Sequence, residues 1–207
     1  MASAFGHAIA ALAIGTAFTP PERVEPVAPT PGSVMRMEIP RWWMLGALAG
    51  VLPDVDVFGF AMGVNYVDFW GHRGFTHSLV FAALVATAFM FAFPRDRWRA
   101  SRPALWSFFF LACASHDILD MLTNGGLGVA LFSPFNNDRF FLPWQPIQVS
   151  PIGVGSFFTA EGLAVIRSEF VWIVLPSLLF ATGAILIKRR ARAARVASPQ
   201  SAAGSIP

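Results

Sequence analysis

Residues 170–187 form a run of 18 residues (FVWIVLPSLLFATGAILI) that contains no charged side chain. A helix needs about 17–25 predominantly apolar residues to cross the hydrocarbon core of a bilayer. The whole chain has the same character, because 55% of its 207 residues are hydrophobic and 13% are charged, whereas soluble domains carry about 25% charged residues. The run therefore predicts a chain that is embedded in a membrane by helices.

Four other apolar segments precede this run, and each is followed by residues that interrupt or stop a helix. These are prolines after the first three segments and Asn124-Gly125 after the fourth. Thr76 is the expected N-cap of the third helix. The predicted helices cover residues 4–18, 42–52, 77–93 and 104–122. Because these segments are 11–19 residues long and contain polar groups, buried helices of an α-helical domain at the membrane interface are the alternative for some of them.

The connecting segments are rich in proline and glycine. We expect no regular structure in residues 20–41, a loop or re-entrant stretch in 57–75, and a long irregular loop in 127–168 before the last helix. The predicted fold is therefore an all-α, polytopic membrane bundle of about four or five helices. One domain would cover residues 1–190, followed by a basic and then disordered tail over residues 191–207.

Basic residues gather in three segments, which are Arg36 to Arg41, Arg95–Arg102 and Lys188–Arg195. If all five helices cross the membrane, these segments lie on one side, which the positive-inside rule identifies as the cytoplasm. The carboxyl terminus would then be cytoplasmic, in a multi-pass protein of the cell inner membrane. Because basic runs often flank membrane helices, we expect membrane lipid and no nucleic acid as a partner.

All four histidines of the chain lie close to aspartates or at the ends of predicted helices. The alternating direction of the helices carries every one of these side chains to the membrane face opposite the arginines. Ionisable residues are costly in membrane segments and are therefore functional candidates. Glu161 and Glu169 lie outside this set and are expected to be solvated. The candidate set comprises His7, Asp54, Asp56, His72, His77, His116, Asp117 and Asp120.

Imidazole nitrogens and carboxylate oxygens are ligands that suit zinc, manganese or iron. His116 and Asp120 are four residues apart on one helix, so they point the same way and can share an ion. Asp117 points about 100° away and is expected to orient another group. The set is too large for one tetrahedral ion, so the site could hold two or more ions. A pair of ions about 3.5–4 Å apart is a known device for phosphoester hydrolysis. We predict zinc as the metal, with manganese as the alternative.

The same residues carry a resemblance to a known family. The motifs are Gly6-His7, LPDVD at 52–56, HRGFTHSL at 72–79 and HDILD at 116–120, and HRGFTHSL is the most specific of them. They resemble the YdjM family of bacterial and archaeal inner-membrane proteins, which are described as metal-dependent hydrolases. The resemblance covers about residues 5–150 and includes DRFFLPWQPIQVSP at 138–151.

That family is similar, more distantly, to the all-α superfamily of zinc-dependent phospholipases C and single-strand nucleases, whose zinc ions are bound by histidine and aspartate. The chain has no histidine after His116, whereas those enzymes use further ligands later in their chains. The similarity implies metal ligands at His7, Asp54, His72 or His77, His116 and Asp120, and our hypothesis includes both His72 and His77.

The sequence thus favours a membrane-bound, metal-dependent hydrolase of phosphoesters such as phospholipids. Asp56 or Asp117 would orient a ligand or act as general base to the metal-bound water, and Arg73 or Arg139 would bind the phosphate.

Two other classes of function stay open. One is a non-catalytic, metal-stapled membrane protein in envelope organisation. The other is a metal transporter, which would place its ligands near the middle of the membrane. A zinc protease is disfavoured because the sequence has no HExxH motif.

Overall fold

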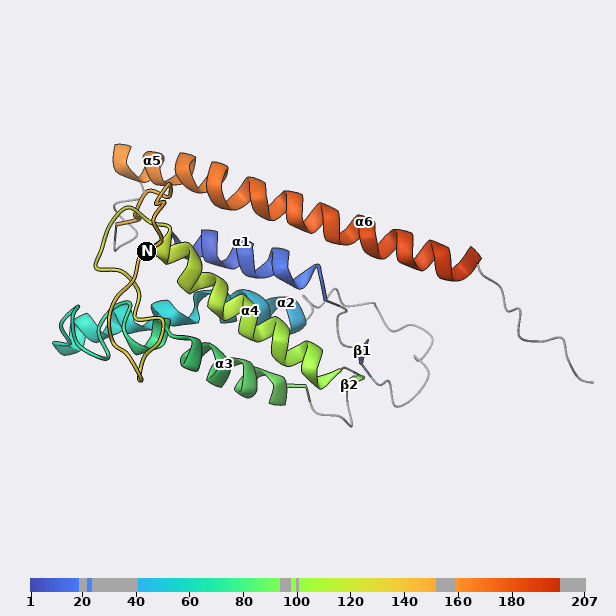
Figure 1. The fold of residues 1–207 in the computed structure, drawn as a ribbon, viewed down its shortest axis with the longest axis horizontal. Coiled ribbons are helices and arrows are strands. Elements are labelled where there is room, and N and C mark those ends of the chain that lie inside the picture. The colour runs from blue at the N-terminus through green and yellow to red at the C-terminus, as the bar shows by residue number, and fades with distance from the viewer. Residues whose placement is uncertain (19–21, 24–40, 94–97, 100, 152–158, 198–207) are drawn as a thin grey trace, which may run out of the picture.

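A computed structural model describes residues 1–18, 22–23, 41–93, 98–99, 101–151 and 159–197. The described part is mainly helical, as the sequence predicts (Figure 1). The helices are α1 (Ala4–Gly15), α2 (Arg41–Val51), η1 (Leu52–Met62), η2 (Phe75–His77), α3 (Leu79–Phe91), α4 (Arg102–Met121), α5 (Ala160–Glu169), η4 (Phe170–Val174) and α6 (Leu175–Ala197). The short strands β1 (Glu22–Arg23) and β2 (Trp98–Arg99) pair antiparallel.

Helices α1 to α4 form a bundle in which α4 packs against the other three, and α6 lies along α1 (Figure 1). An aromatic cluster fills the middle of this bundle. The ring of Trp42 stacks on Phe108 with centroids 3.9 Å apart, and Phe93 and Phe109 surround the pair. Gly46 lies so close to Phe108 that a Cβ atom would come within 2.6 Å of the ring. Close packing of α2 on α4 therefore depends on a residue without a side chain at this position.

Two helical segments are long and apolar enough to cross a membrane, Arg41–Met62 and Ala160–Ala194. In the second, only 6% of the apolar 18-residue window is buried, as expected for a helix whose solvent is lipid. Helices α1 and α3 are apolar but shorter.

Several predicted boundaries are wrong for local reasons. Residues 57–62 are not a loop, because Pro53 lies in the first turn of the 3₁₀ helix η1, where its missing N–H group costs no hydrogen bond. Thr76 does not cap α3, since its hydroxyl donates to Asp56 at 2.6 Å and Ser78 is the N-cap instead.

The carboxyl-terminal third is more helical than predicted. Helix α5 begins at Ala160, inside the predicted loop, and continues through the single π-helical turn η4 into α6. Helix α6 extends through the basic segment to Ala197, so residues 191–197 belong to the helix; residues 198–207 lie outside the described part. The strand Glu22–Arg23 is a small departure from the irregular segment predicted over residues 20–41.

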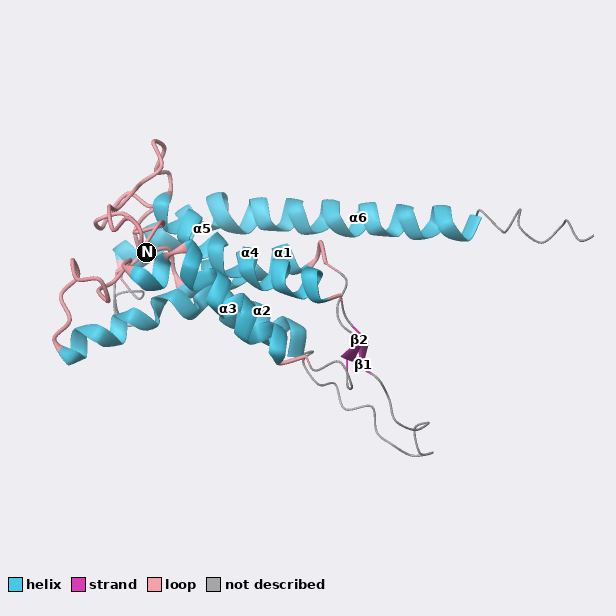
Figure 2. Cartoon of the chain, turned by 60° about the horizontal axis from the view of Figure 1, so that its bottom comes forward, coloured by secondary structure: helices cyan, strands magenta, loops and turns pink. Residues whose placement is uncertain are grey.

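The bundle has two chemically different ends. Helices α2 and α4 begin, and α6 ends, at the end that carries the basic residues (Figure 1). The start of α1, the end of α4, and helices η1 and η2 lie at the other end, where the irregular segments also gather (Figure 2). We call these the basic end and the site end.

Candidate metal centre

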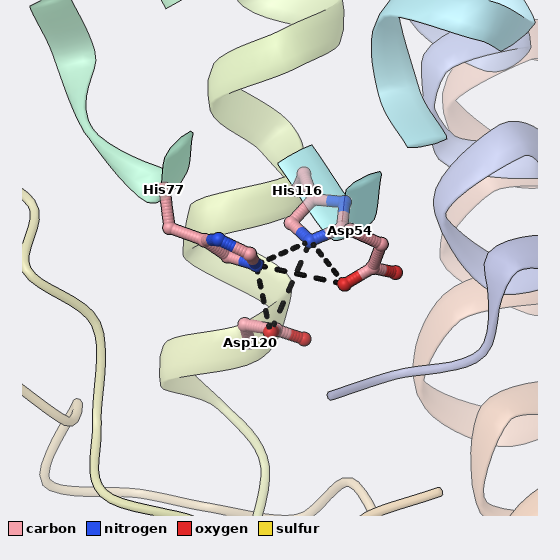
Figure 3. A group of neighbouring side chains, drawn as sticks. All are labelled: Asp54, His77, His116 and Asp120. Atoms are coloured by element: carbon pink, nitrogen blue, oxygen red, sulfur yellow. Dashed lines mark hydrogen bonds and ion pairs between the residues drawn. The ribbon is translucent and has the colours of Figure 1, made fainter. Parts of the chain in front are cut away.

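Four side chains from three separate segments meet at the site end (Figure 3). Asp54 comes from the first turn of η1, His77 from η2, and His116 and Asp120 from successive turns of α4. His116 Nε2 lies 3.0 Å from His77 Nε2 and 3.4 Å from Asp54 Oδ1. Asp120 Oδ2 lies 3.7 Å from His77 Nε2 and 3.9 Å from His116 Nε2. The four ligand atoms therefore surround one point.

The other ring nitrogen of each histidine is held by an acceptor, which fixes its orientation. His116 Nδ1 lies 2.9 Å from the carbonyl oxygen of Gly50, so the Nδ1–H group donates to the backbone of α2. His77 Nδ1 lies 3.0 Å from Asp56 Oδ2. Both rings thus direct Nε2 toward the same point, as metal-bound histidines do. Burial lowers the pKa of His77, but the carboxylates of Asp54 and Asp56 outweigh burial and raise the pKa to about 10. The same negative charge would favour a metal cation.

The spacing of these atoms fits a small divalent ion. Ligands about 2.0–2.1 Å from a tetrahedral zinc ion are about 3.3–3.4 Å apart. The observed separations run from 3.0 to 3.9 Å around that value. Both carboxylate oxygens of Asp54 and both ring nitrogens of His7 are buried without a hydrogen-bond partner in the described residues. Because buried polar atoms are normally paired, these donors fit a bound cation.

His7 extends the group beyond the four central ligands. Its ring stacks on that of His116 with centroids 3.5 Å apart, and its Nε2 lies 3.3 Å from Asp120 Oδ1. Asp120 therefore faces the four-residue group with one oxygen and His7 with the other. The backbone N–H of Ala2 also donates to Asp120 Oδ1, at 2.7 Å. His7 is placed where a further ion could bind beside the first.

Asp56 and His72 form a neighbouring group that shares His77. Each Asp56 oxygen accepts hydrogen bonds, from His72 Nδ1 at 2.7 Å and from the Thr76 hydroxyl and the Arg73 N–H at 2.6 and 3.1 Å. Burial lowers the pKa of His72, although the contact with Asp56 acts in the opposite direction. The arrangement makes Asp56 a residue that orients both histidines, and it leaves His72 outside the four central ligands.

The backbone of the HRGFTHSL segment is shaped to make these contacts. Arg73 has φ of 62°, a left-handed conformation that is unusual for a residue with a side chain. At Gly74 a Cβ atom would come within 2.3 Å of the Phe69 carbonyl oxygen. Strained positions of this kind persist where the surrounding contacts determine them and are common at functional sites.

The two arginines predicted to bind phosphate have protein partners. Arg73 is fully buried and donates to Asp120, Thr123 and the Gly125 carbonyl, all at 2.9 Å. Arg139 donates to the carbonyl oxygens of His72 and Tyr66. Asp117 is buried beside His116, and neither of its carboxylate oxygens has a hydrogen-bond partner in the described residues.

Glu169 is the main site-end residue that the sequence interpretation misplaces. It is buried rather than solvated, and its two oxygens accept hydrogen bonds from the N–H and the hydroxyl of Ser3. Ser3 caps α1, one turn before His7. The only sequence signal was a carboxylate next to a long apolar run, which costs too much in lipid unless it is paired.

Residues 1–192 match the family of YdjM inner membrane proteins. The chain belongs to this family. It is also 43% identical over 141 residues to the inner membrane protein YbcI of Escherichia coli strain K12, a match that covers 68% of this chain and 80% of that protein. No solved structure matches the chain at a significant level. The family resemblance predicted from the motifs is confirmed, as is its location in the inner membrane.

Proposed function

We propose that this inner membrane protein is a metal-dependent hydrolase that cleaves phosphoesters of membrane lipids. The observation that supports the proposal is the convergence of Asp54, His77, His116 and Asp120 on one point. Such a nitrogen and oxygen donor set suits zinc or manganese. A bound ion would polarise the phosphoryl oxygen and lower the pKa of a bound water.

The residues of the chain would position and stabilise the reacting groups. Asp56 and the Gly50 carbonyl hold the two imidazoles, and Arg73 holds Asp120. Asp117 is the candidate for the proton acceptor, because its carboxylate is free of hydrogen bonds to the described residues. Hydrolysis would break one P–O bond, add the water oxygen to phosphorus and give a proton to the leaving alcohol oxygen.

The test is hydrolysis of phospholipid vesicles by purified protein, with and without a chelator. We expect turnover that the chelator abolishes and that added zinc or manganese restores. The Asp117→Asn variant should keep its metal and lose about 10²–10⁴-fold in kcat, the usual contribution of a general base. Turnover that survives complete metal removal would contradict the proposal.

A second candidate is a structural metal, which the deep burial of the site favours. The side chains of His77, His116 and Asp120 are fully buried, and that of Asp54 is 9% exposed. A closed structural site would bind metal tightly and show no turnover. Both ligand groups found among the described residues lie at the site end, which disfavours a transport path.

A further inference from the structure

An apolar groove runs between α1, α4 and α6 along the lipid-exposed side of the bundle. Its volume is about 580 Å³, within the usual range of ligand pockets. Most of its lining is aliphatic or aromatic, including Ile14, Leu111, Ile118 and Phe180. A second hollow of about 410 Å³ shares Ala17 and Phe180 with the first and reaches Lys188 near the basic end. The two hollows adjoin along α6, and we call them together the groove.

The groove begins at the level of the metal centre. Ser115 and Leu119, which line it, directly precede His116 and Asp120 on α4, so they lie at the same level of the helix and point about 100° away from these ligands. Ala10 lines it one turn after His7 on α1. In the close-up view α1 stands next to the ligands, and the carboxyl-terminal helix lies beyond α1 (Figure 3). From this level the groove continues toward the basic end.

The helical rise gives the position of the groove between the basic end and the metal centre. At about 1.5 Å per residue, His116 lies about 21 Å from Arg102 along α4, and Leu111 lies about 13 Å from it. The hydrocarbon core of a bilayer is about 30 Å thick. If the basic end lies at one surface, the metal centre belongs to the opposite leaflet, and the groove extends from it toward the bilayer centre.

The apolar groove and the polar cluster at the level of one end of it indicate which kind of ligand fits. The groove is apolar along its length, and the cluster of cation-binding groups lies at the level of one end of it, on another face of α4. A lipid has the same division, with a phosphoester at one end and hydrocarbon along the rest. A lipid from the leaflet opposite the basic end would need only to place one chain in the groove for its headgroup to lie near the metal centre.

We propose that the groove between α1, α4 and α6 binds one acyl chain of a phospholipid whose phosphoester is held at the metal centre. This rests on the proposed hydrolase and on the multi-pass arrangement, and it specifies the substrate as a long-chain lipid. The groove would supply binding energy in proportion to the apolar area that it covers. Chain length should therefore govern affinity for the substrate.

Two variants fill the groove without touching the metal ligands. Ala17 is exposed at the junction of the two hollows, so Ala17→Trp blocks it. A Cβ at Gly183 would meet nothing within 4 Å, so Gly183→Leu narrows the groove without a clash. Ala88 is an exposed alanine on α3, away from the groove, and Ala88→Trp is the matched control.

Two measurements use these variants in vesicles of phosphatidylglycerol and phosphatidylethanolamine. The first is photolabelling by a phospholipid with a diazirine in its acyl chain, mapped by mass spectrometry. The second compares hydrolysis of long-chain phospholipid with hydrolysis of bis(p-nitrophenyl) phosphate, which has no chain. We expect labels on α1, α4 and α6, and in Ala17→Trp a loss of label and about a tenfold rise in KM for phospholipid alone. Ala88→Trp should behave as the wild type.

The outcomes separate this inference from the proposed function. Labelling spread evenly over all lipid-facing helices, or unchanged in both groove variants, would contradict the binding of an acyl chain in the groove. Equal hydrolysis of phospholipid by Ala17→Trp and the wild type would also overturn it and leave the hydrolase standing. A wild type that cleaves neither substrate would refute the hydrolase, and the photolabel would still decide whether the groove holds a chain.

Discussion

At the scale of single residues, the orientation of the ligands depends on partners that bind no metal themselves. Asp56 accepts from His77 Nδ1 and from His72, and it also binds the N–H of the left-handed Arg73. Residues in this role commonly change metal affinity by 10–100-fold when replaced. None of these contacts follows from the spacing of Asp54 and Asp56 in the sequence.

Replacing Asp56 should weaken metal binding although the four central ligands remain. In Asp56→Asn, we expect the zinc Kd to rise about 10–100-fold, because His77 loses its charged acceptor. Competitive titration against a fluorescent zinc chelator measures the change. Asp68→Asn is the control, since Asp68 is exposed and its carboxylate bonds only to Asn65 among the described contacts. Equal affinity in both variants would count against the orienting role.

The contact between Glu169 and Ser3 should stabilise the helix that carries His7. Ser3→Ala removes the N-cap of α1 and one of the two hydrogen bonds to Glu169, for a loss of about 1–2 kcal/mol. Glu169→Gln should also lower the thermal midpoint in detergent, because a neutral amide is a weaker acceptor. The exposed Glu161→Gln serves as control. A midpoint unchanged in Glu169→Gln would show that the contact is dispensable.

At the scale of elements, the sequence predicted helices where apolar runs end in clear breakers. Predicted helices 104–122 and 4–18 correspond closely to α4 and α1, because proline or glycine follows them at the end. The 3₁₀ helix η1 and the helix α5 were missed, since their contacts are tertiary rather than local. The ligands His116 and Asp120 could be paired from helical spacing alone, whereas the approach of Asp54 and His77 required the packed bundle.

The close approach of α1 and α2 should tolerate no side chain at Gly50. A Cβ there would come within 2.6 Å of Ala11 Cβ and 2.9 Å of the His7 carbonyl oxygen. Gly50→Ala should therefore separate the two helices and cost about 1–3 kcal/mol. It should also weaken metal binding, because the Gly50 carbonyl holds His116. Gly183→Ala, which meets open space, should leave thermal stability and zinc affinity unchanged. Thermal stability and zinc affinity in Gly50→Ala equal to those of Gly183→Ala would contradict this prediction.

At the scale of the whole molecule, the basic end and the site end predict an orientation in the membrane. Single cysteines can test it in a Cys113→Ala background, since Cys113 is the only native cysteine. Asn136→Cys replaces an exposed residue of the loop whose Arg139 donates to the His72 carbonyl oxygen at the site end. Arg192→Cys replaces an exposed residue of α6, which ends at the basic end. A membrane-impermeant maleimide should label the first in spheroplasts and the second only after lysis. The reverse pattern would place the metal centre on the cytoplasmic side.

The fold class and the family were predictable because apolar runs and the HRGFTHSL motif are local in the sequence. Which polar residues bind the metal and which orient the ligands was not predictable, because this depends on which atoms face one point after packing. His72 and His77 illustrate this limit: they lie five residues apart and look equivalent, yet only His77 belongs to the four-residue group. The structure therefore distinguishes the roles of these two histidines, which the motif alone does not.

The most direct test is the metal content of purified protein, measured by elemental analysis for the wild type and three histidine variants. We expect at least one equivalent of zinc or manganese in the wild type and in His72→Gln. His77→Ala and His116→Ala should each retain less than about a tenth of that amount, because each removes one of the four convergent ligands. Metal content in His77→Ala and His116→Ala equal to that of the wild type would contradict the assignment of the metal centre.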